Sequence, residues 1–386
     1  MNPFKRTYLL MMMALLGLTL AFLAGFYTRG LLPGYDPKFP LLGQAYGLLN
    51  ENGYNPLPAS PILEHGMIKG MLQAYGDPFS AFFEPVQTRL QSDSLQGSFG
   101  GIGVRLGKDA QGYPVLYPFP DSPALKAGVR DGDRLLKVDS LPITLETTTD
   151  DLQSIVRGKV GSRVIIMVGR PPDYAPVEIT IQRAEIPLPS VTWHLDATEP
   201  RLGIVEINII AASTADEIGR AIKDLQGRGA TAIALDLRDN GGGLLDAGIN
   251  VARLFLKDGD IIQQQYRGQE IKTYKVEAPG AFASLPLVVL VNQNTASAAE
   301  IISGALQSHK RAQLIGSQTY GKNTIQLVFE LSDKSSLHIT AAHWWIPGFE
   351  FPIGEHGLKP DIPISPDNTD PEAVIKAAVQ ALFPKN

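Results

Sequence analysis

Apolar residues recur along the chain at spacings that change from one region to the next, and each spacing predicts a kind of structure. Residues 8–27 form an uncharged, mainly apolar run, and residues 33–96 carry apolar positions at the three- and four-residue intervals of helices. At Gly97 glycines and short apolar alternations replace this spacing, which predicts a mainly β unit that ends near Ala184. Beyond Pro187 strand-like and helical segments alternate.

This last region predicts an α/β core. Its strand-like runs are short and largely apolar, and its helical segments have one apolar face. The expected strands are 202–209, 232–237, 287–291, 312–315 and 324–331, and the expected helices are 214–226 and 298–308. A strand, helix, strand order favours a mixed, largely buried sheet, whose strand order the sequence leaves open.

The chain is therefore expected to be a multidomain α/β protein. Its 386 residues are too many for one ordinary core, and 44% hydrophobic with 19% charged residues is typical of globular domains. We divide it into a membrane helix (1–30), a small helical segment (31–96), the mainly β unit (97–185) and the α/β core (186–386).

The N-terminal apolar run is long enough to cross a bilayer, which needs about 20 apolar residues. Lys5 and Arg6 precede it, which predicts an N-terminus in the cytoplasm and everything after Arg29 outside, in the periplasm or the extracellular space. A cleaved signal peptide, which would give a secreted form, is the alternative. Because Leu23 to Phe26 make a poor cleavage site, we expect an uncleaved signal anchor.

Composition excludes several other functions. The net charge of -5 and the lack of a long basic cluster argue against nucleic acid as a partner. The absence of cysteine excludes disulfides, thiolate catalysis and cysteine-ligated zinc. The six histidines have no metal-binding spacing and no HExxH motif, so neither a metal nor another cofactor is expected, and each histidine is expected to be structural or exposed.

Ser297 is the first candidate for chemistry. It lies between two alanines where an apolar strand gives way to a helix, so its hydroxyl is open and the unpaired N–H groups of the helix N-terminus are near. Such donors would stabilise an oxyanion formed when the hydroxyl attacks a carbonyl. The alternative is that Ser297 and Glu300 form an ordinary capping box.

Lys322, 25 positions further along, could supply the base that a serine nucleophile needs. A buried lysine has a lowered pKa, because burial disfavours the ammonium form. Gln326 shares a strand face with Lys322 and could orient it by a hydrogen bond. The segment Gly316 to Lys322 also resembles a phosphate-binding loop, but Asn323 replaces the required Ser or Thr and a strand follows, so nucleotide binding is not favoured.

Three glycines, Gly241 to Gly243, follow the expected strand 232–237. Such a turn allows backbone N–H groups to approach a ligand closely, although a plain strand-to-helix turn is an equal alternative. Asp236 and Arg238 at the strand end are either paired or solvated.

Several linked motifs resemble the carboxyl-terminal processing peptidases, also called tail-specific proteases, in order and spacing. The resemblance covers nearly everything after residue 30. The matching segments are 70–80, 99–104 (FGGIGV), 122–133 (SPALKAGVRDGD), 294–300 (NTASAAE), 320–326 (YGKNTIQ) and 356–362 (HGLKPDI).

The resemblance implies a serine endopeptidase with Ser297 as nucleophile, Lys322 as general base and Gln326 as the residue that positions the lysine. The oxyanion hole would use the N–H groups of Ala298 and of Gly242 or Gly243. Family members usually have Pro where Gly241 stands and Ser or Thr with Gly around Asn323, which weakens the oxyanion assignment more than the dyad.

The resemblance also implies that residues 97–185 form a PDZ domain and that 186–386 form the protease core. A PDZ domain captures a free carboxylate in backbone N–H groups, here those of Gly101, Ile102, Gly103 and Val104. The expected substrates are exported or envelope proteins with free C-termini. In relatives this domain gates the active site, and Arg157 is a candidate relay; relatives also often form homo-oligomers.

Two rival functions remain open at this point. One is a catalytically inactive scaffold whose PDZ domain recruits exported proteins. The other is an α/β acyl-transfer or isomerase enzyme that acts on a small thioester, which would also need backbone oxyanion donors but has no evident use for a tail-binding domain.

Overall fold

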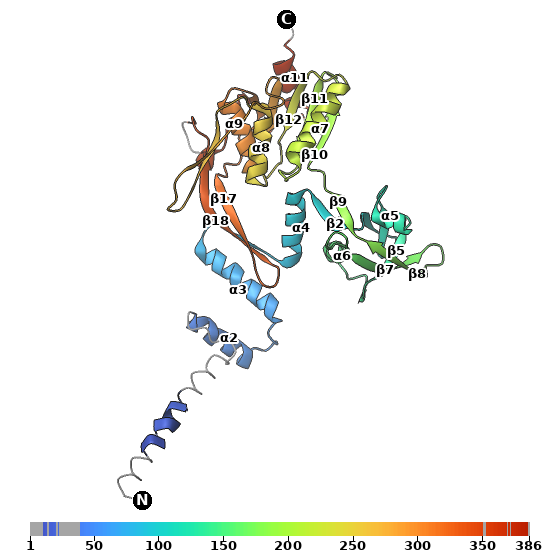
Figure 1. Cartoon of the computed structure of the whole chain (residues 1–386), viewed down its shortest axis with the longest axis vertical. Coiled ribbons are helices and arrows are strands. Elements are labelled where there is room, and N and C mark those ends of the chain that lie inside the picture. Colours follow the sequence, from blue (N-terminus) through green and yellow to red (C-terminus); the bar gives the residue numbers. More distant parts are fainter. Residues whose placement is uncertain are drawn as a thin grey trace, which may run out of the picture. The chain divides into compact units, whose positions relative to one another are not determined.

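The computed structural model describes residues 11–13, 15–20, 22, 39–349, 353–368, 370 and 372–384. The chain divides into two compact units, Met1–Ala74 and Tyr75–Asn386. Figure 1 shows the elements of both. The division falls inside the expected helical segment 31–96, and the other expected domain boundaries stay predictions.

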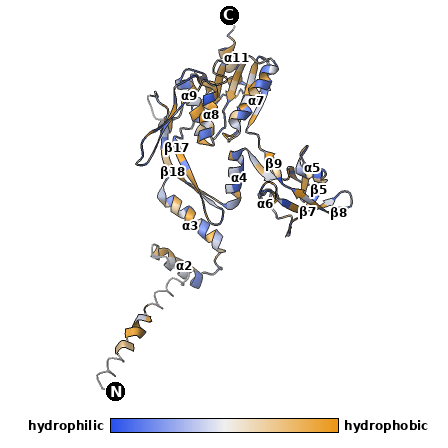
Figure 2. Ribbon diagram, viewed as in Figure 1, coloured by the Kyte–Doolittle hydropathy of each residue, from blue (hydrophilic) through white to orange (hydrophobic). Residues whose placement is uncertain are grey.

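The first unit contains α2 (Pro40–Asn52) and nearly all of α3 (Ser60–Tyr75), which confirms the helical spacing of this region. Neither helix has a buried residue, and apolar side chains such as Leu41 and Ile62 are exposed on them. Figure 2 shows that hydrophobic and polar residues both occur along the two helices. Within the described residues, none of the helices has both the length and the apolar character needed to cross a membrane. Residues 1–10, 14, 21 and 23–30 of the expected anchor lie outside that part, so the membrane helix stays a prediction.

The second unit opens with a short strand and a helix. Strand β1 (Ala81–Phe83) is followed by α4 (Pro85–Gln96), which has proline at its first position and ends at Gly97 in the left-handed conformation, φ 77°. Strand β2 (Ser98–Gly101) then pairs antiparallel with β9 (Ala184–Pro187), so the chain enters and leaves the β domain through one two-stranded ribbon.

The β domain confirms the expected mainly β unit. Its sheet has the order β3-β4-β5-β7-β8, with β6 beside β5, and all its pairings are antiparallel. Helices α5 and α6 complete it around a core that contains Ile102, Leu135 and Ile166. The bounds are β3 Val104–Lys108, β4 Pro114–Pro118, α5 Pro123–Ala127, β5 Asp133–Val138, β6 Leu141–Pro142, α6 Thr149–Val156, β7 Arg163–Arg170 and β8 Ala175–Gln182.

The α/β core is built on a six-stranded mixed sheet with the order β10-β11-β12-β15-β16-β19. Strand β10 is antiparallel to β11, and the later neighbours pair in parallel. Strands β12 and β15 are buried along their whole length, as expected for parallel strands covered on both faces. The bounds are β10 Val191–Leu195, β11 Leu202–Ile207, β12 Ala232–Asp236, β15 Leu287–Val291, β16 Gln313–Gly316 and β19 Ile362–Pro363.

Alternate residues of these strands point to two separate apolar clusters. Ile233 and Leu235 of β12 pack with α7 (Thr214–Gly227), α8 (Leu245–Phe255) and α9 (Ala298–Ser308), whereas Ala234 packs with α11 (Ala373–Leu382). Three helices therefore cover one face of the sheet and α11 covers the other (Figure 1). The expected mixed α/β core is confirmed, and the predicted strands and helices lie within two residues of those observed.

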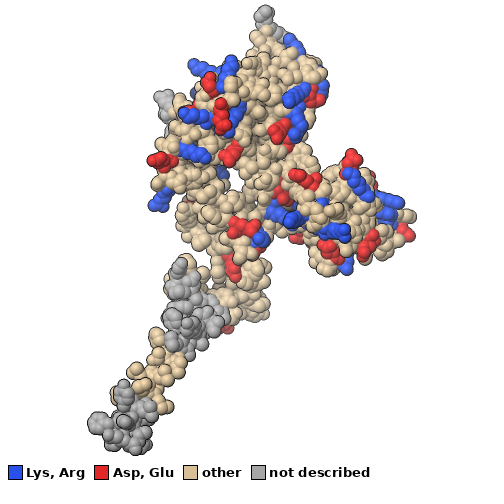
Figure 3. Space-filling view, viewed as in Figure 1, with Lys and Arg blue, Asp and Glu red and all other residues tan. Residues whose placement is uncertain are grey.

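A second, five-stranded sheet was not expected. Its long strand β18 (Ser336–Trp345) pairs with β17 (Thr324–Glu330), with β1 and with β13 (Asp260–Tyr266), which in turn pairs with β14 (Lys272–Lys275). A short helix, α10 (Ile353–His356), follows it. Acidic and basic side chains are interspersed over the face of the core and β domain seen in Figure 3.

Candidate active site

A pocket of about 260 Å³ brings together most of the residues expected to act in catalysis. It is bounded by α4, the glycine turn before α8, the start of α9, and strands β17 and β18. The lining residues are Gln91, Leu95, Gly241, Gly243, Leu244, Leu245, Ser297, Ala298, Ile301, Lys322, Thr324, Ile325, Gln326, Val328, His338 and Trp344.

Ser297 occupies a strained backbone conformation, φ 55° and ψ -120°, in the connection from β15 to α9. An ordinary N-cap serine has extended backbone, so capping alone does not account for this conformation. A serine on a strained strand-to-helix turn is the arrangement that exposes a nucleophile above a sheet. The capping contact from Glu300 is nevertheless present, because the N–H of Ser297 donates to Oε2 of Glu300 at 2.9 Å.

Lys322 is partly buried in the same pocket. Its Nζ donates to Oε1 of Gln326 at 3.3 Å and lies 5.2 Å from the centroid of the Phe79 ring. Burial lowers the pKa of Lys322 below its usual range, and the negative charge of Asp77 opposes that shift. Among the hydrogen bonds of the described residues, none joins the side chains of Ser297 and Lys322.

Gln326 is held in turn from the N-terminal end of the second unit. Its Nε2 donates to the backbone carbonyl of Phe79, which leaves Oε1 directed to Lys322. The interaction of Gln326 with Lys322 that we expected from the shared strand face is thus present. Sequence reasoning missed Phe79 and Asp77, because they lie more than 240 positions before Gln326 and carry no local signal.

A single buried carboxylate, that of Glu300, connects the backbone at Ser297 with the backbone at Lys322. Glu300 is fully buried, and its Oε2 accepts the N–H groups of Ser297 and Lys322, each at 2.9 Å. Its Oε1 accepts the N–H of Gly321 at 2.7 Å and the hydroxyl of Thr319 at 2.6 Å. Burial raises the pKa of Glu300, and these four hydrogen bonds counteract the rise.

Gly242 and Gly243 of the glycine turn differ in their hydrogen bonds and in their position relative to the pocket. The N–H of Gly242 donates to Oδ1 of Asn240 at 2.8 Å, and Gly242 does not line the pocket. Gly243 and Ala298 line it, and their N–H groups have no hydrogen-bond acceptor among the described residues. Of the two glycines considered for the oxyanion hole, the hydrogen bonding thus disfavours Gly242. At the strand end Asp236 and Arg238 are paired, with Nε to Oδ1 at 2.8 Å.

His338 also lines the pocket, although no sequence pattern singled it out among the histidines. Its side chain contacts the Ser336 hydroxyl at 3.1 Å and its ring lies 4.6 Å from that of Phe83. Burial, together with the charge of Lys322, lowers the pKa of His338. Neutral imidazole is therefore the favoured form at neutral pH. Within the described part of the chain, no cluster of acidic and histidine side chains could hold a metal ion.

The residues expected to bind a carboxylate lie at the entry to the β domain. Gly101 ends β2, Ile102 packs in the domain core, Gly103 has φ 71° and Val104 begins β3. Their role in binding stays a prediction. Arg157, at the end of α6, forms an ion pair with Asp93 of α4 at 2.5 Å and lies over the ring of Phe99 at 4.1 Å.

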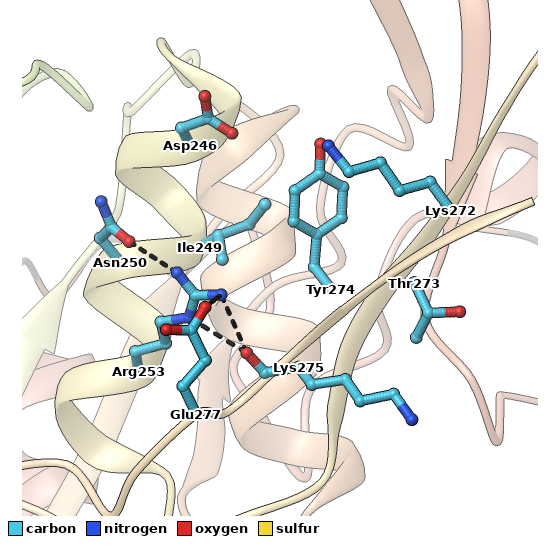
Figure 4. Close-up of a pocket in the computed structure, with 9 residues that line it drawn as sticks. All are labelled: Asp246, Ile249, Asn250, Arg253, Lys272, Thr273, Tyr274, Lys275 and Glu277. Carbon is cyan, nitrogen blue, oxygen red and sulfur yellow. Dashed lines mark hydrogen bonds and ion pairs between the residues drawn. The ribbon is translucent and has the colours of Figure 1, made fainter.

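A second pocket of about 590 Å³ lies between α8 and β14. Figure 4 shows Arg253 beside Asn250 and Glu277, and its guanidinium donates to the side chains of both and to the carbonyl of Lys275. None of the predicted catalytic residues lines this pocket. We therefore assign the candidate active site to the smaller one.

The fold and the site together define a class: a serine-type peptidase whose α/β core is joined to a PDZ domain. Residues 201–364 match the model of peptidase family S41, and residues 115–170 match that of the PDZ domain.

Two relatives of known family are similar to this chain over most of its length. The chain is 32% identical over 328 residues to the carboxy-terminal processing protease CtpA of Bacillus subtilis, with 85% of this chain and 69% of the relative covered. It is 35% identical over 294 residues to the carboxyl-terminal-processing protease of Picosynechococcus sp., with 75% and 70% covered. The chain therefore belongs to the carboxyl-terminal processing protease family, as its motifs predicted.

A solved structure of a photosystem II D1 C-terminal processing protease is also similar. It is 30% identical, with 86% of this chain and 90% of that chain covered and a TM-score of 0.45.

Proposed function

We propose that the protein is a Ser/Lys endopeptidase that cuts exported or envelope proteins near their C-termini. Ser297 acts as the nucleophile, Lys322 as the general base, and Gln326 orients the lysine. The observation that carries the proposal is the common pocket, in which a serine at a strained elbow and a lysine with a burial-lowered pKa both line the wall.

The chemistry follows from these two groups. The neutral amine of Lys322 takes the proton of the Ser297 hydroxyl while Oγ bonds to the carbonyl carbon of the scissile peptide. The tetrahedral intermediate collapses when its C–N bond breaks, and the departing amine receives the proton from Lys322. Water then attacks the acyl ester, gives a proton to Lys322, and releases the new carboxylic acid as the proton returns to Ser297.

Two backbone groups would stabilise the oxyanion of the intermediate. The N–H groups of Ala298 and Gly243 border the pocket and have no acceptor among the described residues, which supports their assignment. The N–H of Gly242 already donates to Asn240, so Gly242 would contribute backbone flexibility rather than a donor. Donors fixed in advance are worth several kcal/mol in acyl transfer.

The PDZ domain would deliver the tail of the substrate. We infer that Gly101, Ile102, Gly103 and Val104 bind the free carboxylate and that Arg157 relays docking to the pocket. Helix α4 supports the relay: Arg89 and Asp93 contact the end of α6, at the Ser154 carbonyl and the Arg157 side chain.

Helix α4 also forms part of the candidate active site, because its residues Gln91 and Leu95 line the pocket. A shift of α6 on tail binding would thus be transmitted to the pocket wall through one helix.

The apolar run from Tyr8 to Tyr27, preceded by Lys5 and Arg6, supports anchoring in a membrane with the peptidase outside the cytoplasm. Fractionation of cells that express the full chain tests this inference. We expect the protein with the membranes and accessible to external protease; recovery in the cytosolic fraction would contradict it.

Cleavage of an unstructured protein such as casein, extended by an apolar C-terminal tail, tests the proposed activity. Wild type should cut it, and Ser297→Ala and Lys322→Ala should not. Equal cleavage by Ser297→Ala would refute the dyad. No cleavage by wild type, with intact tail binding, would favour the inactive scaffold instead.

A further inference from the structure

We propose that Asn240 is a positioning residue that builds the oxyanion site by fixing the peptide group between Gly242 and Gly243. The proposal rests on the function proposed above and adds to it a residue that does not itself line the pocket. Asn240 would act through the glycine backbone, so its loss should affect the chemical step more than peptide binding.

The Asn240 side chain is fully buried and makes two hydrogen bonds of opposite sense. Its Nδ2 donates to the carbonyl of Ile207 at 2.6 Å, and its Oδ1 accepts the N–H of Gly242 at 2.8 Å. A carbonyl can only accept and an N–H can only donate, so these partners fix the orientation of the amide.

The backbone of Asn240 makes a third connection, because its carbonyl accepts the N–H of Ala296 at 2.9 Å. Ala296 immediately precedes Ser297. One residue therefore joins the end of β11, the glycine turn and the nucleophile elbow.

The orientation of the Gly243 N–H follows from the geometry of the peptide between Gly242 and Gly243. The carbonyl of Gly242 accepts the N–H of Ile210 at 2.9 Å. In a trans peptide the carbonyl and the following N–H point in opposite directions, so the Gly243 N–H points away from Ile210. Since Gly243 lines the pocket, this N–H is available to an oxyanion there.

The turn would not hold this orientation by itself. Gly242 and Gly243 have φ values of 100° and 152°, in a region that only glycine adopts readily. A Cβ on Gly242 would lie 2.9 Å from the Cβ of Ser297, so close packing also requires glycine there. Two adjacent glycines allow the peptide to rotate, and the buried Gly242 N–H would lose its acceptor without Asn240.

The test compares Asn240→Ala with wild type on a quenched fluorescent peptide taken from a casein segment that wild type cuts. We expect kcat to fall about 100-fold, the size of effect seen when one oxyanion donor is lost, while KM changes less than about twofold. A peptide aldehyde, which forms a tetrahedral adduct with serine, should lose affinity by about the same factor as kcat/KM. The cleaved peptide product, which forms no adduct, should bind as it does to wild type.

Two further variants keep the test decisive. Asp196→Ala removes the hydrogen bonds of a buried turn residue elsewhere in the core, to Thr198 and Glu199, and should keep kcat within about twofold. Asn240→Asp keeps an acceptor for Gly242 but cannot donate to Ile207 when ionised, so we expect a smaller loss of kcat, about 10-fold. If Asn240→Ala does not fold, the kcat of Asn240→Asp tests the positioning role in its place.

The outcomes separate this inference from the proposed function. If Ser297→Ala is inactive and both Asn240 variants keep wild-type kcat, the positioning role is overturned and the dyad stands. If aldehyde and product lose affinity equally, the role of Asn240 is structural only, which also overturns the inference. If Ser297→Ala cuts the peptide, the proposed function itself fails.

Discussion

Oε2 of Glu300 accepts a hydrogen bond from the backbone N–H of Lys322 at 2.9 Å. The same oxygen accepts the N–H of Ser297, so one carboxylate holds the backbones of the proposed nucleophile and the proposed base. All four groups that contact its two oxygens are donors, which favours the ionised form although burial raises the pKa. The relative position of the dyad therefore depends on a residue that takes no part in the chemistry.

Replacing Glu300 with glutamine should damage both stability and activity. The amide can turn only one acceptor oxygen to four donors, so we expect the free energy of unfolding to fall by about 3 kcal/mol and kcat to fall at least about 10-fold. Denaturant unfolding and peptide cleavage measure the two effects. Thr319→Val, which removes one of the four donors, should cause a smaller loss of stability; a Glu300→Gln protein with wild-type stability and kcat would refute the role of this carboxylate.

Lys322→Met should abolish activity and stabilise the protein. Methionine fills a similar volume without a charge that burial disfavours, so we expect the melting temperature to rise by about 2 °C at neutral pH. Burial lowers the pKa of Lys322 in the folded state. Lys322 therefore reduces the free energy of unfolding most at pH values where its amine is protonated in both the folded and the unfolded protein. The difference from wild type should shrink as pH rises toward the usual lysine pKa, and thermal melts at several pH values measure it. A melting temperature below that of wild type would contradict the burial argument.

Asp77→Asn should move the acid limb of the kcat/KM profile to lower pH. The charge of Asp77 raises the pKa of Lys322 against the larger effect of burial, so removing it leaves more neutral amine at a given pH. Although burial opposes this, hydrogen bonds from the Ser80 hydroxyl and the Phe79 N–H hold the pKa of Asp77 itself below its usual range, so Asp77 is charged over the pH range of the profile. His338, which also lines the pocket, has a pKa lowered by burial and by the charge of Lys322, and should stay neutral there.

Two variants control this pH experiment. Glu330→Gln removes an exposed acid at the far end of β17, paired with Lys334, and should leave the profile unchanged. Gln326→Glu places a carboxylate beside Nζ and should move the acid limb to higher pH. A profile that shifts the same way in both pocket variants would exclude Lys322 as the titrating base.

Arg157→Met should uncouple tail binding from cleavage. In wild type we expect a separate peptide with an apolar free C-terminus to speed cleavage of a fluorescent reporter peptide, and a C-terminally amidated version not to do so. Loss of the Asp93 ion pair and the Phe99 contact should reduce this stimulation about fivefold, with tail affinity largely kept.

Arg163→Met is the matched control, because Arg163 is exposed at the start of β7 and should leave the stimulation intact. Full stimulation in Arg157→Met would contradict the relay.

Local patterns were enough to predict the elements that carry the site. The apolar run 287–291 and the helix 298–308 agree with β15 and α9 residue for residue, because burial and the helix start at Ser297 are both local signals. The sequence also predicted the contact of Gln326 with Lys322, which is present, although Lys322 itself lies before the start of β17.

The surroundings of the site could not be predicted, because they come from distant parts of the chain. Gln326 is held by Phe79, 247 positions away, through a sheet whose pairing of β1 with β18 leaves no local trace. Motifs likewise could not choose between Gly242 and Gly243. The structure distinguishes them in two ways: Oδ1 of Asn240 accepts the N–H of Gly242, and Gly243 lines the pocket whereas Gly242 does not.

Labelling with a fluorophosphonate across a pH series, followed by mass spectrometry of the intact protein and its peptides, tests the central claim most directly. The account predicts one adduct, on Ser297, which forms faster as pH rises through the lowered pKa of Lys322 and is almost lost in Lys322→Met. An adduct on another residue, or equal labelling of Ser297 in Lys322→Met at every pH, would contradict it.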